Sequence, residues 1–267
     1  MSKILVNLVT HSAYADECKI FLKLFEKNWQ DCPYDFSILI VGKPIVFNGY
    51  NCKYLGEKCQ LPEAIYKEMQ NNDYDYCISF LGDAYINSKI DNDAVTRLIN
   101  TIEMREYEYC CLIPRIAFRF CKKDAGEKLR YISSDDVYNM CFVAFVASKK
   151  FVEKEFCNAI SDLEFERKYL KINFKDKKFY ANRVILTENL FNLVPGIDGG
   201  KWNRHSMKKI KKNNPEIEFT DREVVSLRKT LINDMIHFLQ ILISRNQRKK
   251  WKKILEKVFH MRFSTEF

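Results

Sequence analysis

The most constraining feature of the chain is an apolar run that ends at a single acidic residue. Within YDYCISFLGDAYI (74–86), the hydrophobic stretch from Cys77 to Leu81 stops at Gly82-Asp83. Such a run is typical of a buried strand of an α/β sheet, and these sheets bind ligands in the crevice beyond the carboxyl ends of their strands. The sequence therefore predicts that Asp83 lies at the rim of a sheet, where it can bind a metal, a ribose hydroxyl or a substrate hydroxyl. The alternative is that Asp83 only caps the next element or stabilises a turn.

Strand and helix patterns alternate along the rest of the chain. Runs of β-branched and other apolar residues predict buried strands at 3–9, 36–41, 77–81, 109–113, 140–147 and 184–186. Amphipathic patterns predict helices at 16–29, from 61 onward, at 91–103 and at 149–160. This alternation predicts an α/β fold whose central sheet is mainly parallel and is connected by right-handed crossovers.

The positive charge of the chain is concentrated in its last quarter. The chain has 267 residues and a net charge of +9, and this length suits one α/β domain with an appendage. Residues 201–267 hold 17 Lys and Arg against 7 Asp and Glu, whereas the remainder holds 27 against 28. This asymmetry predicts a localised contact with an anionic surface.

The cysteines and the N-terminal sequence bear on the location of the protein. The ten cysteines include no Cys-x-x-Cys pair and no arrangement with histidine at zinc-ligand spacing. Cys77, Cys110, Cys111 and Cys141 fall within apolar elements, where cysteine packs as a small hydrophobe. The first residues, MSKILVNLVTHS, lack the apolar length and cleavage site of a signal peptide. We therefore predict a cytoplasmic protein with reduced thiols.

The basic segment predicts two helices. The sequence TDRE (220–223) matches a capping box, which predicts a helix extending to about residue 244. Charged residues interrupt the apolar run of this helix, so the sequence does not predict that the helix spans a membrane. A second helix, predicted at 246–262, places Trp251 and Ile254 on an apolar stripe flanked by lysines. Such a helix fits peripheral binding to the anionic inner face of a membrane. The alternative is that the stripe packs on the domain or on a second subunit.

Four short segments stand out in chain order. They are LVTHSAY (8–14) followed by FLKLFEKNW (21–29) and DCPY (31–34), then LGDAYI (81–86), SDLEFE (161–166) and GKW (200–202). Together they resemble the small bacterial sugar transferases of the GT-A type, which build capsule, O-antigen or other surface polysaccharides. The resemblance implies a single GT-A-like (Rossmann-like) catalytic domain at 1–202, with a nucleotide-sugar half at 1–115 and an acceptor half at 116–202. Residues 203–267 would then form a basic helical C-terminal extension.

The resemblance also implies contacts to a nucleotide-sugar donor, which in similar enzymes is most commonly a uridine diphosphate sugar. The implied donor-binding residues are Thr10, His11, Ser12, Tyr14, Gly82, Asp83 and Lys201. Tyr14 would stack on a pyrimidine base, and Lys201 would offset the diphosphate charge if no metal is bound. Trp202, in the segment that resembles a late Gly-Lys-Trp element, would contact the acceptor, a glycan or a lipid-linked glycan.

Asp83 is also the implied ligand of a divalent metal, Mg²⁺ or Mn²⁺. Such an ion can use one protein carboxylate together with phosphate oxygens and waters. The sequence departs from a strict Asp-x-Asp motif, because Gly82 stands where an acidic residue is frequent and Tyr85 stands where the second carboxylate would be. Metal dependence therefore stays open.

Inverting transfer needs a base that removes a proton from the acceptor hydroxyl. Glu164 is the first candidate and Glu166 the second, in a segment that resembles a Ser-Pro-Trp-Glu-Phe-Glu signature of the family. If LEFE (163–166) is extended, both carboxylates lie on the same side. The alternative is that Glu164 caps a helix and Glu166 pairs with Arg167 or a lysine.

Other functions have less support in the sequence. The chain has no Gly-x-Gly-x-x-Gly or Walker loop for phosphate binding and no Gly-x-Ser-x-Gly elbow of a hydrolase. A nucleotidyltransferase for sugar phosphates would carry a Gly-rich basic loop soon after the first strand, and 10–16 does not supply one. A non-catalytic protein that binds membranes or RNA through its tail is the third alternative. Nucleic acid is not predicted as a partner, because no RNA- or DNA-binding signature is present.

Overall fold

The computed structural model of the chain describes residues 2–114, 123–133, 136, 140–171 and 179–242, together with positions 247, 250, 251, 253, 254, 256 and 257. The strands are β1 (Ile4–His11), β2 (Asp35–Val41), β3 (Cys52–Gly56), β4 (Tyr76–Leu81), β5 (Ala84–Ile86), β6 (Tyr109–Cys111), β7 (Asp124–Gly126), β8 (Leu129–Ser133), β9 (Ala144–Ser148), β10 (Phe179–Leu186), β11 (Leu193–Pro195), β12 (Ile197–Asp198) and β13 (Lys201–Trp202). The helices are the 3₁₀ helix η1 (Ser12–Tyr14), α1 (Ala15–Trp29), α2 (Leu61–Asn71), α3 (Asn92–Met104), α4 (Lys149–Phe156), α5 (Asp162–Lys171), α6 (Arg204–Asn213) and α7 (Leu227–Leu242).

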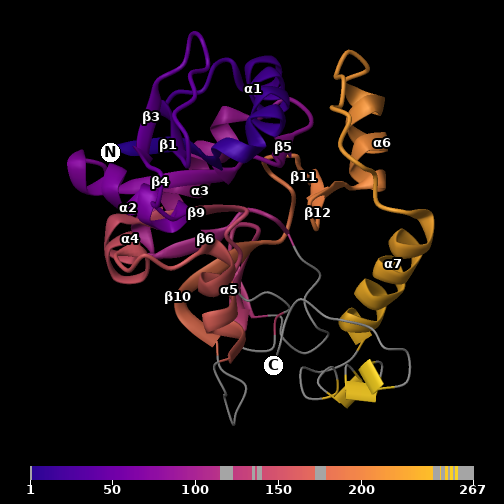
Figure 1. Cartoon of the computed structure of the whole chain (residues 1–267). Coiled ribbons are helices and arrows are strands. Elements are labelled where there is room, and N and C mark those ends of the chain that lie inside the picture. Colours follow the sequence, from indigo (N-terminus) through magenta and orange to yellow (C-terminus); the bar gives the residue numbers. More distant parts are fainter. Residues whose placement is uncertain are drawn as a thin grey trace.

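Nine of the strands form one sheet, in the order β3-β2-β1-β4-β9-β6-β10-β8-β7. Strands β3, β2, β1 and β4 are mutually parallel, and β10 is parallel to β6. Strand β9 is antiparallel to both β4 and β6, and β8 is antiparallel to both β10 and β7. Only β9 and β8 therefore oppose the direction that the other strands of this sheet share. The predicted α/β class and the mainly parallel central sheet are confirmed (Figure 1).

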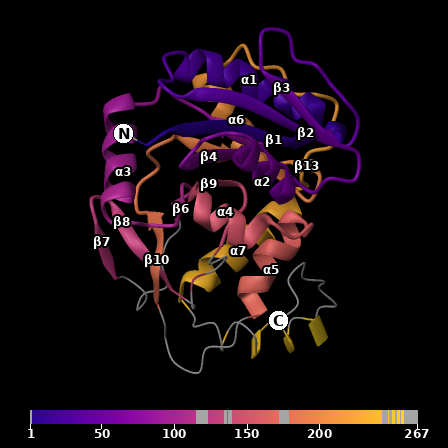
Figure 2. The ribbon, with the colours of Figure 1, turned by 90° about the vertical axis from the view of Figure 1, so that its left-hand side faces the viewer.

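Helices cover both faces of this sheet, because its central strands are apolar on both sides. In β1, Val6 and Leu8 belong to one hydrophobic cluster together with the apolar face of α1. Leu5 and Val9, which point the other way, belong to a second cluster with α2 and α4. Helices α1 and α2 accordingly lie on opposite sides of the strands (Figure 2).

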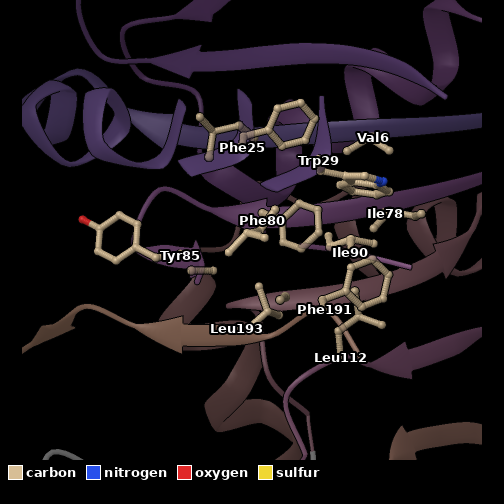
Figure 3. Packing of buried hydrophobic residues seen from close by; sticks show 14 of the residues in the cluster. Val6, Phe25, Trp29, Ile78, Phe80, Tyr85, Ile90, Leu112, Phe191 and Leu193 are labelled. Atoms are coloured by element: carbon tan, nitrogen blue, oxygen red, sulfur yellow. The ribbon is translucent and has the colours of Figure 1, made fainter. Parts of the chain in front are cut away.

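Aromatic rings fill the cluster on the α1 side. Trp29 of α1, Phe80 of β4 and Phe191 pack edge to face, with ring centroids 5.7 to 6.3 Å apart. Tyr85 of β5 lies at the margin of this cluster, and its hydroxyl points away from the other labelled side chains (Figure 3). This packing holds the carboxyl end of β4 against α1.

The first part of the basic segment packs against the domain. Trp202, Ile210 of α6 and Ile217 are buried in the same hydrophobic cluster as α1. Helices α6 and α7 follow one another along one side of the molecule (Figure 1). The described positions of the segment predicted as a second helix are helical, and Trp251 and Ile254 are exposed there.

Helix α7 begins later than the sequence predicts. Thr220 donates its hydroxyl to Oδ2 of Asp16 on α1 (2.9 Å) and does not cap a helix. The chain then continues as irregular structure, with an isolated bridge at Val224, until Ser226 accepts the N–H of Lys229 at the start of α7. The predicted capping box at 220–223 is therefore wrong, because a tertiary contact uses its threonine.

The cysteines of the described part of the chain form no disulfide, and Cys77, Cys110, Cys111 and Cys141 are buried within the sheet and its flanks. Their predicted role as small core residues is confirmed. Among the described residues, no helix has the length and apolar character needed to cross a membrane.

Candidate functional site

The carboxyl ends of β1 and β4 lie side by side at one edge of the sheet, with Val9 opposite Leu81 in parallel register. Beyond them the chain turns through η1 after β1 and through Gly82-Asp83 after β4. Both turns open onto a cavity of about 590 Å³. The cavity is lined by Thr10, His11, Ala13, Tyr14, Glu17, Val41, Glu57, Cys59, Gln60, Leu61, Leu81, Gly82, Asp83, Asp162, Ile197 and Gly200. Segments that are distant in the sequence therefore meet at the strand ends.

Gly82 lets the ends of β1 and β4 approach each other closely. A Cβ atom at this position would lie 3.2 Å from Sγ of Cys18 and 3.3 Å from Oγ1 of Thr10. Thr10 is itself buried, and its Oγ1 accepts a hydrogen bond from the Cys18 thiol (2.9 Å). Gly82 and Thr10 thus shape the wall of the cavity through packing.

Asp83 presents a carboxylate whose hydrogen-bonding capacity is only half used. Its Oδ2 accepts the backbone N–H of Ile197 (3.2 Å), and its carbonyl oxygen accepts the N–H of Gly196 (2.8 Å). Its Oδ1 is buried and has no hydrogen-bond partner among the described residues. Burial raises the pKa of Asp83 to about 6, although the Ile197 N–H acts in the opposite direction. A carboxylate in this state destabilises the folded protein unless a ligand uses it.

Glu17 on α1 is a second buried carboxylate on the same wall, and Arg222 neutralises it. Oε1 of Glu17 lies 2.9 Å from Nη2 of Arg222, and the same nitrogen donates to both carboxylate oxygens of Asp16 (3.0 and 3.2 Å). Burial raises the pKa of Glu17 to about 7; Arg222 acts to lower it, and Asp83 and Asp16 act to raise it. The guanidinium of Arg222 also lies over the ring of Tyr14, 5.4 Å from its centre. Arg222 therefore ties the segment before α7 to the start of α1 at the cavity.

The loop after β1 divides into residues that face the cavity and one that does not. His11 and Tyr14 line the cavity, and Tyr14 is 43% exposed, so its ring is accessible for stacking. Oγ of Ser12 instead accepts the N–H of Lys43 (2.8 Å), and Ser12 is not among the lining residues. Gly42 makes this contact possible, since a Cβ there would lie 2.5 Å from Oγ of Ser12.

Residues 162–166 are helical, which corrects the extended conformation considered from the sequence. Oγ of Ser161 accepts the N–H of Glu164 (3.2 Å), and Oε2 of Glu164 accepts both the N–H and the hydroxyl of Ser161 (2.9 Å each). These reciprocal bonds form a capping box at the start of α5. Hydrogen bonds from Ser161 lower the pKa of Glu164, and the side chain is exposed. The alternative role for Glu164, a helix cap, is confirmed.

Neither predicted base lines the cavity, whereas a neighbouring residue does. Oε1 of Glu166 accepts the N–H of Phe142 (2.8 Å). Asp162, at the first position of α5, is part of the cavity wall with Asp83. The catalytic roles of Glu164 and Glu166 stay predictions, and the position of Asp162 makes it the nearer carboxylate to the site.

Lys201 does not line the cavity, although its neighbour Gly200 does. The ammonium group of Lys201 forms an ion pair with the carboxylate of Glu223, and both side chains are exposed. The role of Lys201 in offsetting the diphosphate charge is not tested by this arrangement and stays a prediction.

Trp202 is enclosed in the core, which corrects its predicted contact with an acceptor. Its side chain is fully buried and packs against Tyr85 and Phe219, with ring centroids 6.2 and 4.9 Å away. Nε1 of Trp202 donates to the carbonyl oxygen of Thr220 (3.2 Å). No face of the indole is available to an acceptor in this conformation.

The charge of the cavity wall is acidic. Among the described residues that line it, four are carboxylic acids (Glu17, Glu57, Asp83 and Asp162) and none is lysine or arginine. The described residues contain no group of three or more His, Cys, Asp or Glu side chains arranged to hold a metal ion. A divalent cation still fits Asp83, because a hard cation bound to a diphosphate can take a single protein carboxylate and complete its shell with phosphate oxygens and water.

Sequence reasoning missed Glu17, Asp162 and Arg222. Asp162 sits in the SDLE sequence (161–164), whose Ser-x-x-Glu pattern signals a helix start and could have placed it at a helix N-terminus. Glu17 and Arg222 carry no local signal, because one lies on an amphipathic helix and the other in an irregular segment near the opposite end of the chain.

Replacing Arg222 by glutamine is expected to lower the free energy of unfolding by about 3 kcal/mol at a pH near 8, because Glu17 is left as an unpaired buried charge. The folded-state pKa of Glu17, about 7, lies above its ordinary value of 4.5. Its protonation therefore favours the folded state below pH 4.5, and this contribution is lost as the pH rises through 7. The loss caused by Arg222→Gln should accordingly be smaller near pH 5.5, as measured by urea unfolding at both pH values.

Lys27→Gln is the matched control for this change. Lys27 pairs with Glu216 at 2.7 Å, but both side chains are about half exposed. An exposed pair of this kind contributes less than about 1 kcal/mol. Equal losses of stability in the two variants near pH 8 would contradict the role given to Arg222.

No protein-family model and no curated protein matches the chain. Solved structures match it at low similarity. A cytidylyltransferase from Leptospira borgpetersenii serovar Hardjo-bovis is 10% identical with a TM-score of 0.39, and the match covers 62% of this chain and 68% of that one. S. aureus TarS 1–349 in complex with UDP-GlcNAc is 11% identical with a TM-score of 0.43, and the match covers 70% of this chain and 56% of that one. A second TarS structure is covered over 35% of its length, so this chain spans about a third to just over half of the TarS chains that it matches. Similarity at this level carries no argument about function, and the fold class stands on the topology described above.

Proposed function

We propose that the chain transfers a sugar from a nucleotide-sugar donor to a hydroxyl group of a glycan or lipid-linked glycan. The observation that carries this proposal is Asp83, a half-buried residue at the carboxyl end of β4 on the wall of a cavity, whose buried Oδ1 has no hydrogen-bond partner among the residues that the structure describes. A buried group of this kind persists where a ligand uses it. The cavity, about 590 Å³, lies in the size range of small-molecule sites. The sequence resemblance to GT-A sugar transferases of capsule and O-antigen synthesis supports the same function.

The nucleotide would lie against the loop after β1. Tyr14 offers an exposed ring that can stack on the base, and His11 lines the cavity beside it. Leu61, the first residue of α2, also lines the cavity. A uridine diphosphate sugar remains the predicted donor.

The acidic wall of the cavity argues for a cation that accompanies the donor. A diphosphate is repelled by carboxylates. Arg222 offsets the charge of Glu17, but the described residues that line the cavity include no lysine or arginine beside Asp83 and Asp162. Asp83 would hold the cation through its carboxylate. When bound, a divalent cation stabilises the negative charge that develops on the leaving diphosphate. Metal dependence, left open by the sequence, is therefore part of the proposal.

The base that deprotonates the acceptor is assigned to Asp162 in place of Glu164. A base must lie within hydrogen-bond reach of the reacting hydroxyl. Asp162 lines the cavity, whereas Glu164 is exposed and bound to Ser161. Asp162→Asn should therefore lower kcat by about a hundredfold or more, and Glu164→Gln should change it by less than about twofold apart from a small loss of helix stability.

Calorimetric titration with uridine, cytidine and guanosine diphosphates, with and without Mn²⁺, tests the proposal. We expect one of them, predicted to be uridine diphosphate, to bind specifically and about tenfold or more tightly with Mn²⁺, because the ion offsets the acidic wall. Asp83→Asn should bind the nucleotide equally with and without Mn²⁺. Turnover is then measured with the matching nucleotide sugars as release of the nucleoside diphosphate together with a glycosylated acceptor.

The other functions predict different results in this titration or in a turnover assay with other substrates. Release of pyrophosphate from a nucleoside triphosphate and a sugar phosphate would identify a nucleotidyltransferase instead. Absence of specific binding by every nucleoside diphosphate would contradict both enzymatic assignments and favour a non-catalytic protein. A cytoplasmic enzyme held at the membrane through residues 246–267 remains the predicted setting for a lipid-linked acceptor.

A further inference from the structure

Helix α7 exposes a stripe of apolar side chains along one side. Leu227, Leu231, Met235 and Phe238 are each between 55% and 68% exposed. With 3.6 residues per turn, these positions fall within a sector of about 80° around the helix axis. We refer to these four residues as the α7 stripe. A contiguous apolar surface on a folded protein is typical of a contact with a partner or a membrane.

The opposite side of α7 is attached to the domain. Thr230 is buried, and Nδ2 of Asn233 donates to Oδ2 of Asp198 (2.7 Å). At the margin of the stripe, the carboxylate of Asp234 lies 3.0 Å from Nε2 of His205 on α6. These contacts set the rotation of α7 about its axis, so the α7 stripe faces away from the domain.

A cation-rich hollow on α6 lies beside α7. A cavity of about 490 Å³ is lined by Arg204, His205, Met207, Lys208 and Val224. The same helix carries further exposed cations at Lys209, Lys211 and Lys212, and it contains no acidic residue. The contact between His205 and Asp234 joins this hollow to α7, and the two helices share one side of the molecule (Figure 1).

We propose that the α7 stripe and the cations of α6 together dock on an anionic lipid bilayer. The apolar side chains of the stripe enter the boundary between headgroups and acyl chains, and the α6 cations, Arg204 and Lys208 among them, lie over the headgroup phosphates. This surface is built from residues that precede 246–267, and the proposal does not depend on the sugar-transfer reaction.

The combination of apolar and basic surface favours a bilayer over two other occupants. A second copy of the chain would bring the basic face of α6 against an identical basic face, which is repulsive. RNA is bound by cations together with stacked aromatic rings, and three of the four stripe residues are aliphatic. A bilayer of anionic lipids satisfies the charge and the apolar stripe together.

Co-sedimentation of the full chain with vesicles that contain phosphatidylglycerol tests the proposal. The chain should bind these vesicles, release them at high salt, and not bind vesicles of phosphatidylcholine alone. The double variant Leu231→Ser, Phe238→Ser should bind these vesicles with an affinity lower by about tenfold or more, because two apolar side chains no longer enter the bilayer. The double variant Lys208→Gln, Lys209→Gln should lose about fivefold in affinity for each cation removed.

Two substitutions elsewhere on the chain serve as matched controls for the vesicle experiment. Met104→Ser on α3 and Lys19→Gln on α1 change exposed residues away from this surface and should bind as the unaltered chain does. Equal vesicle binding by the Leu231 and Phe238 double variant, with residues 246–267 intact, would overturn the proposal and leave that segment as the membrane contact. A dimer that the stripe substitutions dissociate in the absence of vesicles, or RNA binding without vesicle binding, would overturn it in favour of those occupants.

Discussion

Replacing Asp83 by asparagine is expected to lower the rate of the proposed sugar transfer by about a hundredfold or more and, at the same time, to stabilise the folded protein near pH 8. Asparagine retains the shape of the side chain and can still accept the N–H of Ile197. It carries no charge, however, with which to hold a cation or the donor. Loss of one group that stabilises transition-state charge typically lowers kcat by about 10²–10³-fold. Opposite effects on activity and stability are typical of a residue retained for function.

The expected gain in stability follows from the pKa of Asp83. The carboxyl has an ordinary value of 3.8 and, because burial raises it, a value of about 6 in the folded protein. Folding therefore takes up a proton between these values. The contribution of Asp83 to stability is most favourable below pH 3.8 and is lost as the pH rises through 6. Thermal unfolding should give Asp83→Asn a higher Tm than the unaltered chain near pH 8 and an equal one near pH 4.

Asp136→Asn is the matched control, since Asp136 is a buried residue whose carboxylate accepts hydrogen bonds from an arginine and from a backbone N–H. Its Oδ2 accepts a hydrogen bond from Arg130 at 2.7 Å and another from the N–H of Ser133 at 2.8 Å. The asparagine variant should lose stability at neutral pH, because the buried ion pair between Asp136 and Arg130 is lost. Wild-type activity in Asp83→Asn would refute the site, and a lower Tm near pH 8 would refute the argument from burial.

Replacing Trp202 by alanine is expected to lower the free energy of unfolding by about 3–5 kcal/mol, the usual effect of removing a large aromatic side chain from a core. The indole is fully buried between Tyr85 and Phe219. Its Nε1–H bond to the carbonyl oxygen of Thr220 is also lost, which loosens the segment that carries Arg222. Urea unfolding measures the loss. The KM for the acceptor should be unchanged, and the apparent kcat should fall only in proportion to the unfolded fraction.

Trp251→Ala is the control for this substitution. Trp251 is 53% exposed, so its removal should change stability by less than about 0.5 kcal/mol. The variant Trp202→Phe, which keeps an apolar ring, should recover part of the stability lost in Trp202→Ala. If Trp202→Phe raised the KM for the acceptor and left stability unchanged, the acceptor contact inferred from the sequence would be right and the core role wrong.

Much of the sheet could be predicted because its strands are buried on both faces. The run at 77–81 and the apolar sequence of β1 mark strands without knowledge of their neighbours, and Asp83 follows one of them directly. The direction of β9 could not be predicted, because its residues are equally apolar in either orientation. The sequence pattern specifies burial, and the connections across the sheet specify direction.

One motif that occurs twice shows where local reasoning ends. Ser161 and Glu164 form a capping box at the start of α5. The sequence TDRE (220–223) has the same Ser/Thr-x-x-Glu pattern, yet it starts no helix. Thr220 and Arg222 instead donate hydrogen bonds to Asp16, and Arg222 also forms an ion pair with Glu17. A hydrogen bond within three residues and one to a distant helix compete for the same hydroxyl. The pattern alone does not reveal which bond forms.

The amino-acid sequence by itself determined which segments become strands and that a lone carboxylate follows β4, since continuous apolar runs and the residue that ends them are local properties. Only the tertiary structure decided that Arg222, 206 positions along the chain from Asp16, reaches the start of α1, that Trp202 is enclosed, and that Asp162 rather than Glu164 lines the cavity. The physical reason is that charge pairing and the enclosure of a ring depend on which distant segments meet, and that is set by packing across the whole domain.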